Sequence, residues 1–177
     1  MIVSVFGSSS PTPSSIIYQE AFRLGRQIAH HGHIVMNGGY SGLMEAVSRG
    51  AAESEGKVIG VTCNEIEKWR PVKPNPWITE EVRFETLQER LFFLVSHCDS
   101  AVALPGGIGT LTEISLIWNL VVTEAFEKKP IWLVGQQWKK IIQSFFDYMH
   151  DYIPEMQRAH LVFFDNIDEI INSLGKM

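Results

Sequence analysis

Short apolar runs alternate with longer amphipathic segments along almost the whole chain, and this alternation constrains the fold more than any other feature. The runs are rich in Val, Ile, Leu and Phe and cover residues 2–6, 34–36, 58–62, 101–104, 131–134 and 161–164. Most of them are apolar on both faces, which is typical of central strands in a parallel sheet between two helical layers. The alternation therefore predicts an α/β fold, a doubly wound parallel sheet with helices on both faces.

The segments between the apolar runs carry apolar residues at spacings of three and four, which predicts helices. The predicted helices cover residues 14–31, 42–55, 86–97, 110–126, 138–152 and 168–174. The third begins with Thr86-Leu87-Gln88-Glu89, a capping-box pattern. Three prolines lie between residues 67 and 80, and we expect a loop there that lies over the C-terminal edge of the sheet.

Length and charge narrow the class of protein. The chain has 177 residues and a formal net charge of -5, and at ~100–200 residues per domain we expect one domain over residues 1–177. An acidic chain lacks the basic footprint of a nucleic-acid-binding protein. No apolar run approaches the ~20 residues that span a membrane, and the first ten residues lack the basic start of a signal peptide. We therefore expect a cytoplasmic protein that binds neither nucleic acid nor membrane.

The cysteines and the clustered histidines lack the spacing of metal ligands. Cys63 and Cys98 make no disulfide framework, and we expect two reduced, partly buried thiols. His30, His31 and His33 cluster at a predicted helix end, and their spacing matches no common zinc site. We therefore expect no metal.

The strongest functional signal is a glycine-rich turn between a predicted strand and a predicted helix. It reads Pro105-Gly106-Gly107-Ile108-Gly109-Thr110, and because it is the last of three such loops along the chain we call it the third glycine loop. Glycine lets the backbone turn sharply and approach a ligand closely, and a helix N-terminus presents free N–H groups and partial positive charge. This pattern favours a phosphate cradle. The alternative is a glycine-rich turn that only connects two elements.

Two further glycine-containing loops also follow predicted strands. The first glycine loop is Gly7-Ser8-Ser9-Ser10, and the second runs from Asn37 to Met44 and contains Gly38, Gly39 and Gly42. All three loops lie at C-terminal ends of predicted strands, where an open α/β sheet forms its ligand-binding crevice. Their convergence at one edge predicts an anionic ligand such as a nucleotide.

Two charged residues are candidates for chemistry at that edge. Glu113 completes Thr110-Leu111-Thr112-Glu113, which is a capping-box pattern, so its alternative role is to hold the start of the helix. The spacing of Arg90 from Leu87 and Leu94 places it toward the packed face of its helix. Such an arginine either grips a phosphate or carboxylate or forms a salt bridge, here with Glu85 or Glu89.

These motifs resemble those of the LOG ("Lonely Guy") family, formerly described as lysine-decarboxylase-like. The run from Pro105 to Glu113 matches the PGGxGTxxE signature of that family in full, and the run from Gly38 to Met44 is similar to its GGGxxGLM segment. Val5-Phe6-Gly7-Ser8-Ser9 resembles its first strand and loop, and Arg90 resembles the arginine of its M-x-x-R-K segment.

The resemblance implies a Rossmann-like nucleotide-binding domain, a homodimer, and hydrolysis of the N-glycosidic bond of a nucleoside 5'-monophosphate to free base and ribose 5-phosphate. It implies Arg90 and Glu113 as the catalytic pair, with no metal or organic cofactor, and the third glycine loop as the holder of the 5'-phosphate. The residues expected to contact phosphate or nucleotide are Gly7, Ser8, Ser9, Gly38, Gly39, Gly42, Met44, Gly106, Gly107, Ile108, Gly109 and Thr110.

Four positions depart from the family pattern and keep alternatives open. Leu91 replaces the lysine after the arginine, Asn37 replaces the first glycine of GGG, and Glu45 and Thr112 replace a glycine and a common glutamate. The leading alternative is a non-catalytic carrier of a phosphorylated ligand such as molybdenum cofactor, which the loss of the lysine favours. A nicotinamide-dependent oxidoreductase is disfavoured because the first loop is not G-x-G-x-x-G. A purely structural role leaves the glycine loops unexplained.

Overall fold

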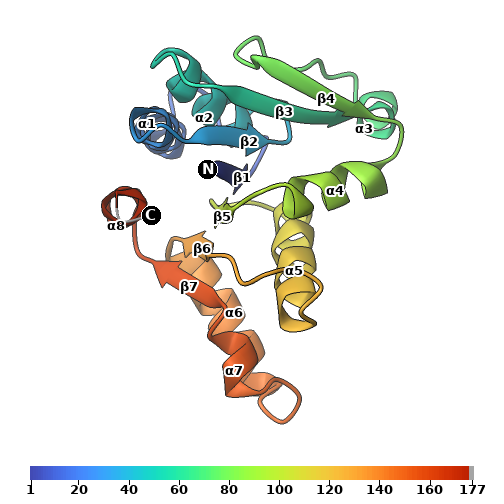
Figure 1. Ribbon diagram of the computed structural model, residues 1–177, viewed down its shortest axis with the longest axis vertical. Coiled ribbons are helices and arrows are strands. Elements are labelled where there is room, and N and C mark those ends of the chain that lie inside the picture. Colours follow the sequence, from blue (N-terminus) through green and yellow to red (C-terminus); the bar gives the residue numbers. More distant parts are fainter. Residues whose placement is uncertain (176–177) are drawn as a thin grey trace.

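Parallel strands form one sheet in the order β4-β3-β2-β1-β5-β6-β7 in this computed structural model, which describes residues 1–175 (Figure 1). The strands are β1 Ile2–Phe6, β2 Ile34–Asn37, β3 Val58–Cys63, β4 Glu80–Phe84, β5 Ser100–Ala103, β6 Ile131–Val134 and β7 Leu161–Phe164. The central strand β1 pairs with β2 on one side and with β5 on the other. The strand order therefore reverses between β1 and β5, which is where doubly wound sheets open their crevice.

Helices cover both faces of the sheet, so the predicted doubly wound, Rossmann-like fold is confirmed (Figure 1). The helices are α1 Ile16–His30, α2 Leu43–Ala52, α3 Asn64–Trp69, α4 Leu87–Ser96, α5 Ile108–Val122, α6 Gln136–Tyr148, α7 Glu155–Arg158 and α8 Ile167–Leu174. Helices α1, α2 and α8 pack on one face, and α4, α5 and α6 pack on the other.

The strand side chains alternate between the two cores, as the period of two in a β-strand requires. Val102 and Leu104 pack in the core with α1 and α2, whereas Ala101 and Ala103 pack in the core with α4 and α5. Because both faces are buried, the central strands favour apolar residues at most positions, and this is the pattern that the sequence carries.

Three short elements were absent from the prediction. The edge strand β4 reads Glu-Glu-Val-Arg-Phe, and its charged side chains are exposed, as is common in edge strands. Helix α3 begins before the predicted loop and ends inside it at Trp69, residues 70–79 of that loop remain irregular, and α7 is a single turn. In the part of the chain that the structure describes, no helix is long and apolar enough to cross a membrane.

Candidate functional site

The three glycine loops meet at the C-terminal ends of β1, β2 and β5, as the sequence predicted for that edge. The backbone N–H of Ser8 donates to the carbonyl oxygen of Pro105 at 3.1 Å, which joins the first loop to the third. The N–H of Leu43 donates to the carbonyl oxygen of Ser8 at 2.9 Å, and the Ser41 hydroxyl donates to that of Ser9 at 3.1 Å. The first loop is therefore hydrogen-bonded to both of the others.

The second loop approaches the first so closely that Gly42 leaves no room for a side chain. Its φ is +71°, which disfavours any residue with a Cβ, and a Cβ built there would stand 2.4 Å from the carbonyl carbon of Ser9. Gly7 is also tightly packed, with Leu43 atoms 3.2 Å from the position of its Cβ. These glycines thus serve the packing of loop on loop.

The third loop differs because two of its glycines, Gly107 and Gly109, face open space, whereas a Cβ on Gly106 would stand 2.2 Å from the Thr110 hydroxyl oxygen. Gly106, Gly107, Ile108 and Gly109 are exposed, and a Cβ on Gly107 or Gly109 would meet no atom within 4 Å. Helix α5 begins at Ile108 with Gly107 at its N-cap and without a side-chain cap. The first N–H groups of a helix have no acceptor inside it, so this end is an exposed donor surface with partial positive charge.

The predicted capping box of Thr110 and Glu113 is wrong. Helix α5 starts two residues earlier than predicted, so Thr110 lies buried inside its first turn instead of preceding it. The Thr112 hydroxyl donates back to the carbonyl oxygen of Ile108 at 2.8 Å. Glu113 therefore does not cap the helix, so helix capping does not explain why a carboxylate lies at this position.

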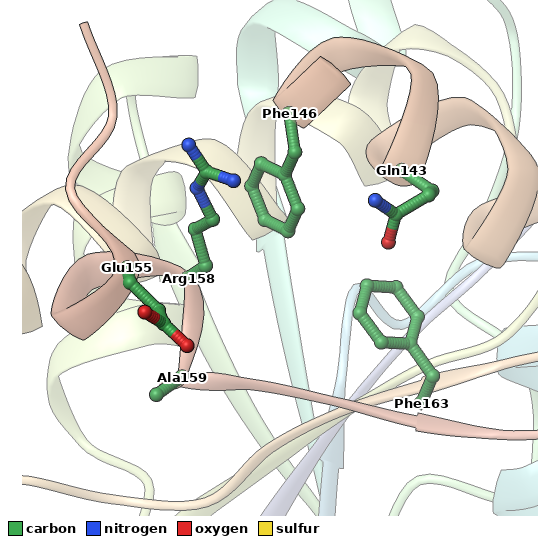
Figure 2. A pocket seen from close by; sticks show the side chains of 6 residues that line it. All are labelled: Gln143, Phe146, Glu155, Arg158, Ala159 and Phe163. Atoms are coloured by element: carbon green, nitrogen blue, oxygen red, sulfur yellow. The ribbon is translucent and has the colours of Figure 1, made fainter. Parts of the chain in front are cut away.

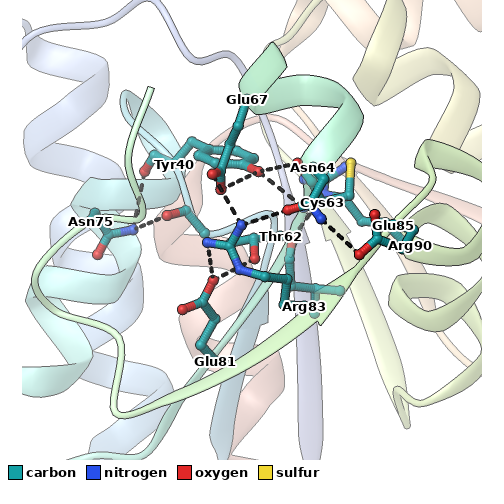
Figure 3. A network of polar contacts seen from close by, with 12 residues as sticks. Tyr40, Thr62, Cys63, Asn64, Glu67, Asn75, Glu81, Arg83, Glu85 and Arg90 are labelled. Atoms are coloured by element: carbon teal, nitrogen blue, oxygen red, sulfur yellow. Dashed lines mark hydrogen bonds and ion pairs between the residues drawn. The ribbon is translucent and has the colours of Figure 1, made fainter. Parts of the chain in front are cut away.

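Arg90 is buried beneath the second loop, and its guanidinium is held by backbone oxygens (Figure 3). Its Nε donates to the carbonyl oxygen of Val61 at 2.8 Å and its Nη2 to that of Gly38 at 3.1 Å. The guanidinium carbon lies 5.8 Å from the centre of the Tyr40 ring, a cation–π distance. A Cβ on Gly38 would stand 1.9 Å from Nη2, so glycine is required there.

The alternative role of Arg90, a salt bridge with Glu85 or Glu89, is not found among the described residues. The Glu85 carboxylate accepts a hydrogen bond from Asn64, and the Glu89 carboxylate closes the predicted capping box with Thr86, which is confirmed. Among residues 1–175 no carboxylate forms an ion pair with Arg90. A buried cation without an adjacent counter-charge is costly, because its desolvation is not repaid by a paired anion.

Glu113 is the buried acid of the same region. Burial raises the pKa of its carboxyl to about 7, while the positive charge of Arg90 acts in the opposite direction. Arg90 is thus close enough to influence this carboxyl, yet the two do not pair directly within the described part of the chain. A carboxyl that titrates near neutrality is suited to acid–base or electrostatic roles in chemistry.

Sequence reasoning missed the polar side chains that hold the second loop in place (Figure 3). Asn75, from the proline-containing loop, is buried and donates through Nδ2 to the carbonyl oxygens of Gly39 at 3.1 Å and Tyr40 at 3.0 Å. The Tyr40 hydroxyl accepts from the N–H of Cys63 at 3.0 Å. The one signal for Asn75 in the sequence was its place between two prolines. Prolines restrict the backbone there, but they do not indicate which groups the Asn75 side chain bonds.

Other candidate sites lie away from the loops. One hollow, of about 520 Å³, is lined by residues of α6, α7 and β7, which Figure 2 draws as sticks. The Arg158 guanidinium in its wall donates to the carbonyl oxygens of Ile153 and His150. A second hollow, of about 730 Å³, follows α4 past Leu87 and Phe92. Within residues 1–175 no three His, Cys, Asp or Glu side chains gather as metal ligands, and Cys63 and Cys98 are buried and unpaired.

Comparison with known proteins gives a family and relatives. The model of the SLOG cluster4 family matches residues 1–159. The chain is 37% identical over 117 residues to the probable cytokinin riboside 5'-monophosphate phosphoribohydrolase LOGL5 of Oryza sativa subsp. japonica, which covers 63% of this chain and 45% of that protein. It is 23% identical over 188 residues to the pyrimidine/purine nucleotide 5'-monophosphate nucleosidase of Escherichia coli K12, covering 99% of this chain and 40% of that one. The chain thus spans less than half of both relatives.

A solved structure shares the fold over nearly the whole chain. The molybdenum cofactor binding protein of Rippkaea orientalis superimposes with a TM-score of 0.75, covers 99% of this chain and 95% of its own, and is 22% identical in sequence. At that identity the likeness concerns the fold. The same arrangement of sheet and helices is therefore found in a protein described as binding molybdenum cofactor. The sequence relatives, in contrast, are named as a phosphoribohydrolase and a nucleosidase.

Proposed function

The chain belongs to the SLOG cluster4 family, and from this premise we propose that it hydrolyses the N-glycosidic bond of a nucleoside 5'-monophosphate, releasing free base and ribose 5-phosphate. The observation that carries the proposal is the pair Arg90 and Glu113. Both are buried, they carry opposite charge, and they are joined by no ion pair among the described residues, beside three converging loops. The relatives named as acting on nucleotide monophosphates support the same class of substrate.

The third glycine loop is the proposed site of the 5'-phosphate. Its exposed glycines allow close approach, and the free N–H groups at the start of α5 supply donors for phosphate oxygens. The backbone of the first and second loops would then flank the nucleoside. In this arrangement the anion needs no positive net charge on the protein, since backbone N–H groups provide the binding.

Glu113 is the proposed stabiliser of the reacting sugar. Cleavage of a glycosidic bond builds positive charge on the ring in an oxocarbenium-like transition state, and an ionised carboxylate at hand stabilises that charge. The same carboxylate can orient the attacking water, whose hydroxyl adds to the anomeric carbon while a proton goes to the departing base. Arg90 is the proposed partner that holds the sugar or its phosphate in position for this step.

A base-release assay tests the proposal. The protein is incubated with AMP, CMP, GMP and UMP, and free base and ribose 5-phosphate are quantified together, since hydrolysis yields them in equal amounts. The corresponding nucleosides, which lack the phosphate, are the control and should react far more slowly. Absence of base release from all four nucleotides, in protein shown to be folded, would contradict the proposal.

The second candidate is a non-catalytic carrier of a phosphorylated ligand such as molybdenum cofactor. It is favoured by Leu91, a half-buried apolar residue next to Arg90 that lines the hollow along α4, where the resembling enzymes carry a lysine. A carrier would bind its ligand at the same loops without turning it over. Pterin fluorescence or molybdenum that co-purifies with the protein, without base release, would support this candidate instead.

We further propose that the chain forms a homodimer through α4 and works in the cytoplasm without nucleic-acid or membrane partners. Leu87 and Phe92 of α4 are exposed, although they are large and apolar, and Leu116 of α5 lines the same hollow. Sedimentation analysis of the wild type should give a dimer, and Phe92→Glu should shift it to a monomer. A monomeric wild type at micromolar concentration would contradict this assignment.

A further inference from the structure

Arg70 brings a second cation to the glycine loops from a segment that the sequence motifs do not include. It follows α3 at the start of the irregular residues 70–79, and its Nη1 donates to the Ser9 hydroxyl at 3.1 Å. Ser9 belongs to the first loop, which is hydrogen-bonded to the second and third loops. The Arg70 guanidinium therefore lies at the junction of these loops, 61 residues along the chain from its partner.

The charge of Arg70 is not neutralised by the protein. Within residues 1–175 no carboxylate forms an ion pair with it, whereas Arg23 and Arg49 each have one and Arg83 has two. Its Nε is buried and has no hydrogen-bond partner among the described residues, and its Nη2 makes no hydrogen bond to them. A buried N–H donor of a charged group rarely lacks an acceptor, because the hydrogen bond to water that it loses on burial must be replaced.

We propose that Arg70, held by Ser9 of the first glycine loop, binds the phosphate that the third glycine loop cradles, an inference that rests on the proposed function. A phosphate supplies both of the things that Arg70 lacks, a counter-charge and hydrogen-bond acceptors, and the planar guanidinium matches its oxygens well. The alternative reading, a structural arginine that only anchors α3, leaves the buried Nε and the missing counter-charge unexplained.

The proposed role concerns recognition of phosphorylated ligands. Arg90 contacts Val61 and Gly38, whereas Arg70 contacts Ser9, so the two cations serve different loops. A group that binds the phosphate equally in the ground state and in the transition state changes KM and leaves kcat nearly unchanged. Loss of Arg70 should therefore reduce the preference for nucleotide over nucleoside.

The test compares Arg70→Met with a control, Arg23→Met. The control removes the same charge from an exposed ion pair between Arg23 of α1 and Asp168 of α8. Arg70→Met should raise KM for AMP about 10- to 100-fold and weaken calorimetric binding of ribose 5-phosphate by a similar factor. Binding of adenosine, the matched ligand without phosphate, should not change, and kcat should stay within about twofold. Arg23→Met should match the wild type in every measurement.

The outcomes separate this inference from the proposed function. Should the wild type release no base but bind ribose 5-phosphate, weaker binding by Arg70→Met still supports Arg70 as the phosphate ligand. Unchanged KM and unchanged ribose 5-phosphate affinity in folded Arg70→Met overturn it, as does equal weakening toward adenosine. Arg70→Gln, which keeps a donor for Ser9 without the charge, gives the same readout should the methionine variant fail to fold.

Discussion

Arg90 and Gly38 form a contact in which the absence of a side chain on one residue makes room for the charge of the other. The Nη2 atom of Arg90 donates to the carbonyl oxygen of Gly38 at 3.1 Å, and a Cβ on Gly38 would lie 1.9 Å from that nitrogen. The contact joins residues 52 positions apart and fixes the second glycine loop above a buried cation. The position of the guanidinium thus depends on the glycine.

Replacing Gly38 with alanine should displace that guanidinium. The new methyl group would also lie 2.7 Å from the Met44 sulfur, so relief in that direction is limited. We expect the free energy of unfolding to fall by about 2 kcal/mol, the scale of a lost hydrogen bond to a charged group, and base release to fall with it. Urea unfolding measures the first effect. In an Arg90→Met background the same substitution should be far less harmful; additive losses would contradict the assigned contact.

Glu113→Gln should separate binding from turnover. The amide keeps the shape of the side chain but cannot carry the negative charge proposed to stabilise the sugar. We expect base release to fall by about 100-fold or more, while nucleotide binding measured by calorimetry is retained. Glu127→Gln, which alters an exposed carboxylate beyond α5, is the control and should behave as the wild type. Equal turnover by both variants would rule out the role given to Glu113.

Base release should rise with pH through neutrality. The proposed chemistry uses the ionised Glu113, and burial raises the pKa of this carboxyl to about 7. The value of kcat/KM should therefore increase to a plateau above pH 7, with an inflection that reports the free enzyme. The nucleotide phosphate also titrates, near pH 6. The pH dependence of nucleotide binding to Glu113→Gln gives the contribution of the phosphate alone. If the wild-type rate follows the same pH curve, the inflection does not come from Glu113.

Stability should depend on pH through the same carboxyl. The folded pKa of about 7 lies above the ordinary value of 4.5, so between these pH values the folded chain holds a proton that the unfolded chain has released. The free energy of unfolding therefore falls as pH rises through this window, by up to about 3 kcal/mol, and is constant again above it. Urea unfolding of wild type and Glu113→Gln at pH 5 and pH 8 isolates this term. A difference between the two proteins that is the same at both pH values would argue against a raised pKa.

Gly109→Ala should stabilise the protein and weaken its binding of nucleotide. Gly109 lies in the first turn of α5, and a Cβ there meets no atom within 4 Å, so alanine adds helix propensity of up to about 1 kcal/mol without a clash. The added methyl group stands where the phosphate is proposed to approach, and KM should rise about tenfold. Ser115→Ala, at an exposed position of the same helix, is the control for propensity alone. Unaltered KM in Gly109→Ala would move the phosphate away from this loop.

The central strands and long helices were predictable because their burial on both sides demands long apolar patterns. The edge strand β4 was not, since an edge exposed to water accepts Glu80, Glu81 and Arg83 and so loses the apolar pattern that marks a strand. The start of α5 was misplaced because Thr110 and Glu113 match a local capping pattern, whereas the glycines before them allow the helix to begin at Ile108.

The sequence by itself determined the α/β class, the parallel sheet and the edge at which the glycine loops gather, because the apolar periodicity and the alternation of strands with helices are local patterns. Only the tertiary structure decided what each charged side chain faces. It buried Arg90 against Gly38 and Val61, raised the pKa of Glu113, and brought Arg70 to Ser9. The physical reason is that burial and electrostatic environment arise from segments far apart in the chain, which no local spacing encodes.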